Sequence, residues 1–564
     1  MLRGRAMTAN RRSASTATLA DAAPGVGDEP PRRRGETCGT RWIVAAACAL
    51  AAFAAPGAGV GASEVAPGTP IVAVRIERHD IYDLDDPATS GRAYRWIDAL
   101  HVLTRENFIR SLLLFQVGDA LDPLRLAESE LILRSTGFLN PVTISAQPVP
   151  GGAEVVVETR DQWTIGVDFA YNVSGNRESS GGSVSDDNLL GMGKRVLLDF
   201  SSDPERRSMT VGYRDLTFFG SRWQLDLKYT DSTDGFAHFL RVQYPFFALK
   251  TPRAGGVEWR QEVAEGYLWS EGERAVTGAA DTRDFETWFG LRLPGEGIRT
   301  DRLIVGLFGE RARFGEWSRV DGSPYPRPAD RDLLGAEAGW EHQTFRWKVV
   351  QGFRSWHRQE DLPLGPNWRL TAGFSSPALG GDRPRLRYRA VLDVGRWRER
   401  TYMWMQADLA GRFENGGLSN AISHLELGGA MTGKAGFRLR AAADLGHELD
   451  GERQLTLGAD TGLRGYDPNS FDGTSRVVAN VEWRRRLTGE FLHVAVLGLT
   501  AFVDGGKTWG ARVGPSTEGW RSDVGAGLLL EITRASVVRI VRLEVALPDR
   551  GGQAVFQITS QSLF

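Results

Sequence analysis

Apolar and polar residues alternate in many short segments from residue 162 to the end of the chain. The segment 476–484 is representative: one face carries Val477, Ala479, Val481 and Trp483, and the other carries Arg476, Asn480, Glu482 and Arg484. Turns rich in Gly, Asp, Asn and Pro separate these segments, and no convincing helix of about ten residues interrupts them. A period of two residues is that of a β-strand with one apolar face. The pattern therefore predicts a large, mainly antiparallel β-structure.

This alternation fits two architectures. In a soluble sandwich the apolar faces turn inward, whereas in a membrane barrel they face lipid and the charged faces line the lumen. The number of segments favours the barrel, as do aromatic residues near segment ends: Trp163, Tyr171, Tyr229, Tyr244, Trp340, Trp404 and Trp483. Alternating runs number roughly 16 to 20, and strands cannot be separated from long loops in residues 255–360. Because each strand with its loop takes roughly 25 residues, we predict a transmembrane antiparallel β-barrel of about 16 strands over residues 162–564.

The first 62 residues have the pattern of a secretion signal. A basic stretch ending at Arg41 precedes an apolar run of about fourteen residues, 42–55, which is too short to span a bilayer comfortably. Small residues follow this run, and we expect cleavage near Ala62 of a leader comprising residues 1–62. An N-terminal anchor helix is the alternative. Beyond residue 62 no run of about eighteen apolar residues exists, so that part of the chain is either soluble in the periplasm or outside, or crosses a membrane as a closed β-barrel.

Charge and cysteine content narrow the function classes. The first 62 residues carry eight Arg and four acidic residues, a net +4, so the −2 of the whole chain leaves −6 for the remainder. A mildly acidic exported part argues against nucleic acid as a partner. The two cysteines, Cys38 and Cys48, both lie in the predicted leader. Without that leader the chain has no thiol for a disulfide, a zinc–thiolate site or a cysteine nucleophile.

A small α+β domain is expected between the leader and the barrel, at residues 68–161. Strand patterns at 71–76, 142–147 and 153–159 enclose two helical patterns, which begin near Thr104 and at Asp122-Pro123. Asp followed by Pro is a typical helix start, with Asp as the cap and Pro in the first turn. The expected order is β-α-α-β-β, and a generic small α+β domain is one interpretation of it.

Several segments resemble the BamA/TamA superfamily of outer-membrane proteins. Residues 115–120 and 133–139 are similar to its periplasmic POTRA module, and residues 82–98 look like an insertion into that module. The barrel motifs are similar at residues 187–194, 213–216, 219–222, 463–466, 501–506 and 542–548. Of these, Leu463-Arg464-Gly465-Tyr466 is similar to the VRGY/F signature of the sixth extracellular loop. The chain ends on Phe564, as outer-membrane barrels commonly do, and this residue is the expected C-terminal barrel signal.

The resemblance implies a non-enzymatic protein of the bacterial outer membrane, with the POTRA domain in the periplasm. Its function would be insertion of proteins into, or translocation across, that membrane. Implied partners are outer-membrane lipids and unfolded or extended client proteins, which the POTRA domain would accept by strand addition; periplasmic chaperones or helper lipoproteins are further partners. The first strand, near 163–174, and the last, 553–564, would form a seam that opens for clients. No cofactor and no metal are implied.

The resemblance also implies a site in the barrel lumen. The loop that carries Arg464 would fold back into the lumen, where the arginine would pair with Glu482 and Asp504. Gly465 would allow a tight turn at the wall, and Tyr466 would pack on neighbouring barrel residues. Five strand patterns follow this loop, which places it between strands 11 and 12 of 16. The alternative is an ordinary exposed loop arginine.

Motifs of enzymes are missing from the sequence. None of the eight histidines has a metal-ligand spacing such as H-E-x-x-H, and no G-x-S-x-G nucleophile motif occurs. The segment 191–194 lacks the first glycine and the following Ser or Thr of a phosphate-binding loop. Two other functions stay open: a passive porin-like channel, which would not need the domain at 68–161, and an outer-membrane hydrolase, for which no nucleophile is evident.

Overall fold

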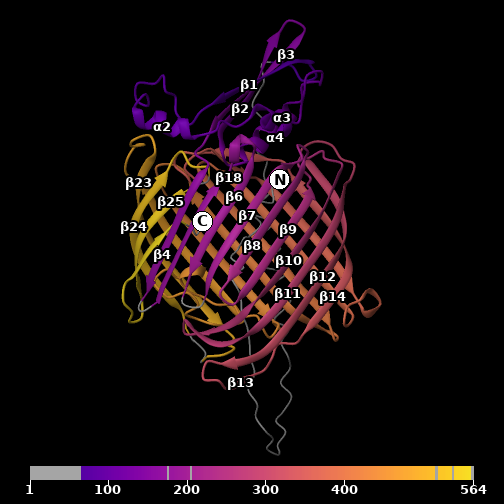
Figure 1. Cartoon of the computed structure of the whole chain (residues 1–564), viewed down its shortest axis with the longest axis vertical. Coiled ribbons are helices and arrows are strands. Elements are labelled where there is room, and N and C mark those ends of the chain that lie inside the picture. Colours follow the sequence, from indigo (N-terminus) through magenta and orange to yellow (C-terminus); the bar gives the residue numbers. More distant parts are fainter. Residues whose placement is uncertain (1–64, 175–176, 204–205, 515–518, 537–538, 561–564) are drawn as a thin grey trace, which may run out of the picture.

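The computed structural model describes residues 65–174, 177–203, 206–514, 519–536 and 539–560. The predicted leader, both cysteines and Phe564 lie outside the described residues. A small α+β domain stands at one end of a large β-barrel (Figure 1). We call this the domain end of the barrel and the opposite end the far end.

The small domain is a three-stranded sheet covered by helices. Its elements are β1 (Ile71–His79), α2 (Arg92–Leu100), α3 (Glu106–Leu112), α4 (Pro123–Arg134), β2 (Leu139–Val149) and β3 (Gly152–Asp161). The sheet order is β1-β3-β2, with β1 parallel and β2 antiparallel to β3. Apolar side chains of α3 and α4, such as Ile109 and Leu133, pack with Val155 of the sheet in one core. Helix α2 is additional to the expected order; it begins within the predicted insertion and ends two residues beyond it.

The barrel closes on itself through consecutive antiparallel strands. They are β4 (Ile165–Ser174), β5 (Arg177–Asp186), β6 (Lys194–Ser202), β7 (Arg207–Phe218), β8 (Trp223–Ser232), β9 (Gly235–Tyr244), β10 (Arg253–Ser270), β11 (Glu273–Arg292), β12 (Arg299–Arg319), β14 (Arg331–Thr344), β17 (Gly365–Ser375), β18 (Arg385–Arg398), β19 (Thr401–Glu414), β20 (Gly417–Met431), β21 (Ala435–His447), β22 (Ser475–Arg486), β23 (Ala495–Trp509), β24 (Arg521–Ile532), β25 (Arg539–Pro548) and β26 (Val555–Thr559). Strand β26 pairs with β4 and so closes the sheet; the two-residue β13 (Pro324–Tyr325) pairs only with β12.

The predicted fold class is confirmed, but the predicted strand number is wrong. Apart from β13, the closed sheet among the described residues has 20 strands rather than 16. Each strand with its turn takes roughly 20 residues instead of the 25 assumed, because many turns are only two residues long, such as Glu399-Arg400 and Asn415-Gly416. Five strands follow the Arg464 loop, as predicted, yet the loop lies between the fifteenth and sixteenth strands rather than the eleventh and twelfth.

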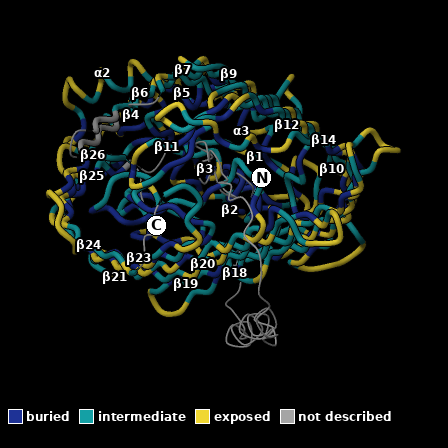
Figure 2. The backbone as a smooth tube through the Cα atoms, turned by 90° about the horizontal axis from the view of Figure 1, so that it is seen from below, coloured by how far each residue is buried: buried dark blue, intermediate teal, exposed yellow. Residues whose placement is uncertain are grey.

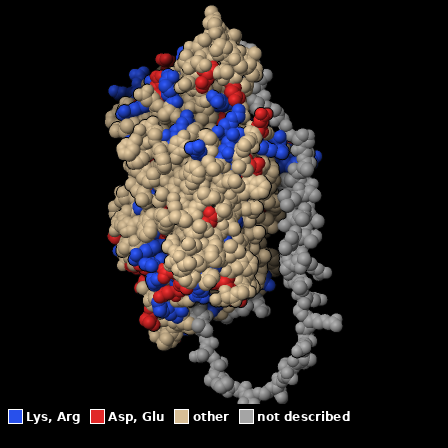
Figure 3. All heavy atoms as spheres, turned by 90° about the vertical axis from the view of Figure 1, so that its right-hand side faces the viewer, with Lys and Arg blue, Asp and Glu red and all other residues tan. Residues whose placement is uncertain are grey.

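The two faces of the wall differ as a membrane barrel requires. In β20, Leu425 and Leu427 point outward and are exposed. His424 and Glu426, which alternate with them, point inward, where they bind Asp444 and Trp404. Figure 3 shows, on the face in view, a broad band nearly without charged groups between charged groups toward both ends. An apolar outer band around a polar interior is the arrangement of a barrel in a bilayer.

Two segments lie inside the barrel and are bound to its inner wall. The first is the loop 448–474 between β21 and β22, which enters from the far end. The second, which we call the strap, is residues 345–364 between β14 and β17 at the domain end; it contains β15 (Trp347–Val350) and β16 (Glu360–Pro363). None of the described helices is long and apolar enough to cross a membrane.

Candidate functional site

The loop 448–474 folds back on the inner wall of the barrel. Leu457 and Leu463 are fully buried and pack with Ala442 of β21 and Val478 of β22. Leu457 and Phe471 exchange two backbone hydrogen bonds of 2.8 and 3.0 Å, which hold the two arms of the loop together. The loop is therefore a packed element of the lumen, and its tip is held in one conformation.

Arg464 at the tip of this loop is buried among carboxylates. Its Nε and Nη2 donate to the two oxygens of Asp504 at 2.7 and 2.9 Å. Its Nη1 donates to Glu482 Oε2 at 2.8 Å and lies 3.5 Å from Glu544 Oε1. The guanidinium carbon also lies 3.4 Å from the ring centre of Phe502. Only the planar fork of arginine can bind one carboxylate with two parallel bonds while reaching a second.

Two more arginines complete this cluster. Arg484 donates to Glu482, and Arg542 donates to Glu482 Oε2 at 2.7 Å and to Glu544 Oε1 at 2.6 Å. The side chains of the cluster are at most 4% exposed. With Arg464, the cluster holds three arginines and three carboxylates, those of Glu482, Asp504 and Glu544, so that the formal charges balance. Buried ions of this kind are tolerable only when each is paired and hydrogen-bonded.

Two amides hold the backbone of the loop at the same place. Asn480 Nδ2 donates to Gly462 O at 2.7 Å and to Asp504 Oδ1 at 2.8 Å. Gln557 Nε2, from the last strand, donates to Arg464 O at 3.0 Å. The loop tip is thereby attached to β22, β23 and β26. We call these contacts, with the arginine cluster, the latch.

Gly465 and Tyr466 take different places beside the latch. A Cβ at Gly465 would lie 2.6 Å from the Cβ of Asp523 on β24, so only glycine fits between loop and wall. The hydroxyl of Tyr466 donates to Asp549, beyond the end of β25. The structure thus brings together the predicted residues Arg464, Glu482 and Asp504, and it places their two loop neighbours against the adjoining strands.

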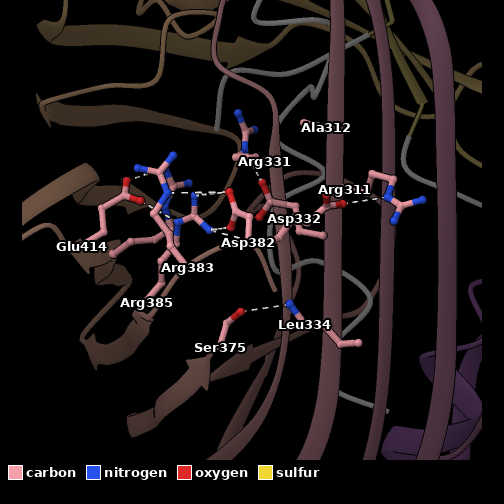
Figure 4. A network of polar contacts seen from close by, with 12 residues as sticks. Arg311, Ala312, Arg331, Asp332, Leu334, Ser375, Asp382, Arg383, Arg385 and Glu414 are labelled. Atoms are coloured by element: carbon pink, nitrogen blue, oxygen red, sulfur yellow. Dashed lines mark hydrogen bonds and ion pairs between the residues drawn. The ribbon is translucent and has the colours of Figure 1, made fainter. Parts of the chain in front are cut away.

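The stem of the loop is bound to β14 and β19, two strands that take no part in the latch. Arg331 of β14 pairs with Glu452 at 2.6 Å, and Arg412 of β19 pairs with Asp450 at 2.6 Å. These arginines belong to a wider polar network at the far end (Figure 4), which includes ion pairs of Arg311 with Asp332 and of Arg385 with Asp382 and Glu414. The loop therefore spans the far end of the lumen, from β14 and β19 to the latch.

The strap closes the domain end of the lumen. Phe353 is 4% exposed and packs edge-on against Tyr402 of the inner wall, with 5.5 Å between ring centres. Five strands further around the barrel, Glu531 of β24 accepts hydrogen bonds from Trp356 N at 2.8 Å and His357 N at 3.3 Å. The strap thus crosses from β19 to β24, with its backbone donors satisfied by a buried carboxylate.

The strap also binds the small domain. Arg134 of α4 forms a two-bond ion pair with Asp361, at 2.9 and 2.8 Å. Asn140 Nδ2 donates to Gln359 O at 2.9 Å, and the side chain of Arg358 donates to Gly137 O at 2.6 Å. The orientation of the small domain therefore depends on a segment that itself fills the lumen.

A second junction joins the small domain to the β5–β6 turn. The buried carboxylate of Asp161 accepts hydrogen bonds from Thr104 N at 2.7 Å and from His101 Nε2 at 2.9 Å, and Asn188 donates to the Thr104 hydroxyl. Burial lowers the pKa of His101, but its bond to Asp161 and that carboxylate's charge raise the pKa further, so the net shift is upward. The pair therefore stabilises the junction fully below pH ~6.5 and loses this effect as the pH rises through the raised pKa of His101.

Sequence reasoning missed part of the site. Alternation places Arg484 on the polar face of Glu482, but no role in the site was predicted for it, and Arg542 and Glu544, which share one face of β25, had no predicted role either. Gln557 and the strap carry no local signature. Among the described residues, no group of three or more His, Cys, Asp or Glu side chains is placed to hold a metal ion.

Comparisons with known proteins give likenesses in structure only. No family model matches the chain, and no curated protein matches it. BamA from Haemophilus ducreyi lacking POTRA domains 1–3 is 13% identical, with 89% of this chain and 90% of that chain covered and a TM-score of 0.36. CdiB from Acinetobacter baumannii is 11% identical (87% and 73% covered, TM-score 0.43), and CdiB from Escherichia coli is 14% identical (87% and 76% covered, TM-score 0.43). Such low identities and scores do not assign the chain to a family.

Proposed function

We propose that this chain is an outer-membrane protein of the BamA/TamA kind, which takes part without enzymatic activity in inserting proteins into the outer membrane or moving them across it. The latch supports this most strongly. It ties a loop from the far end, through the Arg-Gly-Tyr motif, to the strands next to the barrel closure. The loop tip thus contacts the last strand itself, through Gln557, at the closure where that strand pairs with the first.

The closure between β26 and β4 is the proposed exit for clients. Among the described residues, Phe556 pairs with Val173, Gln557 with Asn172 and Ile558 with Tyr171. Opening this seam would expose strand edges, and an unpaired edge recruits another strand. Gln557 of the last strand is part of the latch. The latch would therefore hold the last strand while β4 moves away.

The small domain would receive the client. Strands β1 and β2 are the edges of its sheet, because β3 lies between them. An extended segment could add to such an edge through backbone hydrogen bonds without a fixed sequence. With the domain in the periplasm, as we propose, chaperones or helper lipoproteins would deliver clients there.

A passive channel is the weaker proposal. The loop 448–474 and the strap both lie in the lumen, and both are bound to its wall by buried polar groups. A barrel of 16 to 18 strands already encloses an aqueous channel when it is empty. A conducting pore would have no use for two segments that fill it.

Depletion of the protein, followed by quantitative proteomics of the outer membrane, tests this function. We expect a subset of outer-membrane or exported proteins to fall and to recover with the wild-type gene. The variant Val173→Cys/Phe556→Cys, with Cys38 and Cys48 replaced, should fail to restore them while oxidised and should succeed once reduced, because a cross-linked seam cannot open.

The matched control is Val481→Cys/Val503→Cys, which cross-links β22 to β23 at an ordinary outward-facing pair. It should restore the proteins in both redox states. An unchanged proteome on depletion would contradict the function itself. Full activity of the oxidised seam variant would contradict the proposed exit.

A further inference from the structure

Helix α2 exposes an apolar stripe that the protein does not cover. Trp96 is 72% exposed, Leu100 is 59% exposed, and Val102 just beyond the helix is 48% exposed. Trp96 and Leu100 are four residues apart and therefore lie on one side of the helix. No residue of α2 is buried, whereas α3, shorter by two residues, buries Phe108, Ile109 and Leu112. The stripe is thus a surface in need of a partner.

The opposite side of α2 is held by the barrel. The hydroxyl of Tyr94 donates to Leu492 O at 3.0 Å, in the turn between β22 and β23. Its ring lies 4.8 Å from that of Tyr82, whose hydroxyl bonds His493 O of the same turn. Ile97 is only partly exposed. The helix is therefore fixed against the barrel, and its apolar stripe faces away from this contact.

The stripe continues an apolar rim at the domain end of the barrel. Both views place α2 at the outer edge of the ring of strands (Figure 1 and Figure 2). Leu100 and Val102 border a small cavity together with Ile165 and Leu190, which are themselves exposed. Leu492, which accepts the bond from Tyr94, is 71% exposed. Ile165 is the first residue of β4, so α2 lies beside the edge of the outward-facing wall at this end of the barrel.

Charge on α2 fits an anionic membrane surface. Arg92 and Arg95 are exposed and lie beside the stripe, and the first turn has no acidic residue. Asp98 is turned from solvent, and burial raises its pKa to about 6. A short helix with Trp and Leu on one side and Arg beside them is typical of a segment that lies in the headgroup region.

We propose that α2 is an interfacial anchor, which inserts Trp96, Leu100 and Val102 at the boundary between headgroups and acyl chains and pairs Arg92 and Arg95 with anionic phospholipid headgroups. It would hold the small domain at the membrane surface, beside the β22–β23 turn. This inference needs the barrel to lie in a bilayer, but it does not depend on what the barrel transports.

Quenching in proteoliposomes tests the anchor. The full chain, with Cys38 and Cys48 replaced, would carry Trp96→Cys labelled with an environment-sensitive fluorophore, in vesicles of phosphatidylethanolamine and phosphatidylglycerol. The matched control is Val117→Cys, a 56% exposed apolar position on the same domain. It neighbours Gly118, which binds Ile71 at the end of the sheet remote from the barrel. Heat-modifiable migration in electrophoresis would show that both variants fold.

We expect the label at position 96 to emit at shorter wavelength and to be quenched by nitroxide-bearing lipids but not by iodide in the buffer. The label at position 117 should emit at longer wavelength and should be quenched by iodide but not by nitroxide-bearing lipids. The double change Arg92→Glu/Arg95→Glu should lower the equilibrium constant for membrane docking about five-fold or more per arginine in anionic vesicles, and far less in neutral vesicles.

Two results would overturn the anchor. A label at 96 that iodide quenches and lipid does not would show that α2 lies in water. A label shielded from both quenchers would show that a protein surface covers the stripe. Neither result would affect the depletion experiment, so the anchor and the proposed function can fail separately.

Discussion

Replacement of Arg464 by alanine is expected to destabilise the barrel by about 3–5 kcal/mol and to free the loop 448–474. The change removes both bonds to Asp504 and the bond to Glu482, and it leaves the Asp504 carboxylate buried without its cationic partner. Denaturant unfolding of the protein in liposomes would measure the loss, and protease cleavage in the loop would report its release. The variant should still reach the outer membrane but restore a depleted strain only weakly.

Arg389→Ala is the matched control for this change. Arg389 also forms a two-bond ion pair, with Asp408, but its side chain is 58% exposed. An exposed pair contributes only about 0–1 kcal/mol. The second change Asp504→Asn should recover part of the loss in Arg464→Ala, because it removes the unpaired charge. Equal stability of Arg464→Ala and the control, with an intact loop, would contradict the role given to the latch.

Shortening the strap is expected to open the lumen at the domain end. Val350 and Glu360 are paired across β15 and β16, so residues 351–359 can be replaced by an Asn-Gly turn that closes the hairpin. This removes Phe353 and the groups that bind Glu531. A barrel of 20 strands is wider than a porin, so the freed space should fill with water. Planar-bilayer recordings should show low conductance for the wild type and several-fold higher conductance for the variant.

Replacing the turn Glu399-Arg400 by Asn-Gly is a control at the same end of the barrel. Both side chains are exposed, so conductance should not change. If the wild type already conducts steadily at the level of the strap variant, the strap does not block the passage of ions through the lumen. That result would favour the passive channel.

The alternation of residues was sufficient for the fold class but not for the strand number. Strands β10, β11 and β12 are 18 to 21 residues long and carry charged residues on both faces toward the far end. In β11 the run Asp281-Thr282-Arg283-Asp284 looks like a loop by composition, yet all four residues pair with β12. Charge on both faces makes the far-end part of these long strands resemble loops, and two-residue turns between other strands leave little signal.

The site was partly accessible from sequence because the Arg464 motif and its acidic partners lie within 41 residues of one another in recognisable segments. The strap was not. Its contacts with Gly137 and with Glu531 join residues more than 170 positions apart, and no residue in it belongs to a motif. Such contacts depend on which strands the closed barrel brings to opposite sides of one mouth, and this requires the correct strand number.

Accessibility along β20 tests most directly the claim that these strands form a barrel in lipid. Nitroxide labels would be placed one at a time at residues 424 to 427, in the cysteine-free background and in native-like bilayers. We predict that labels at Leu425 and Leu427 collide with oxygen dissolved in lipid and are protected from aqueous nickel, whereas labels at His424 and Glu426 are protected from lipid. Free access of aqueous nickel to positions 425 and 427, with 424 and 426 no different, would contradict the account.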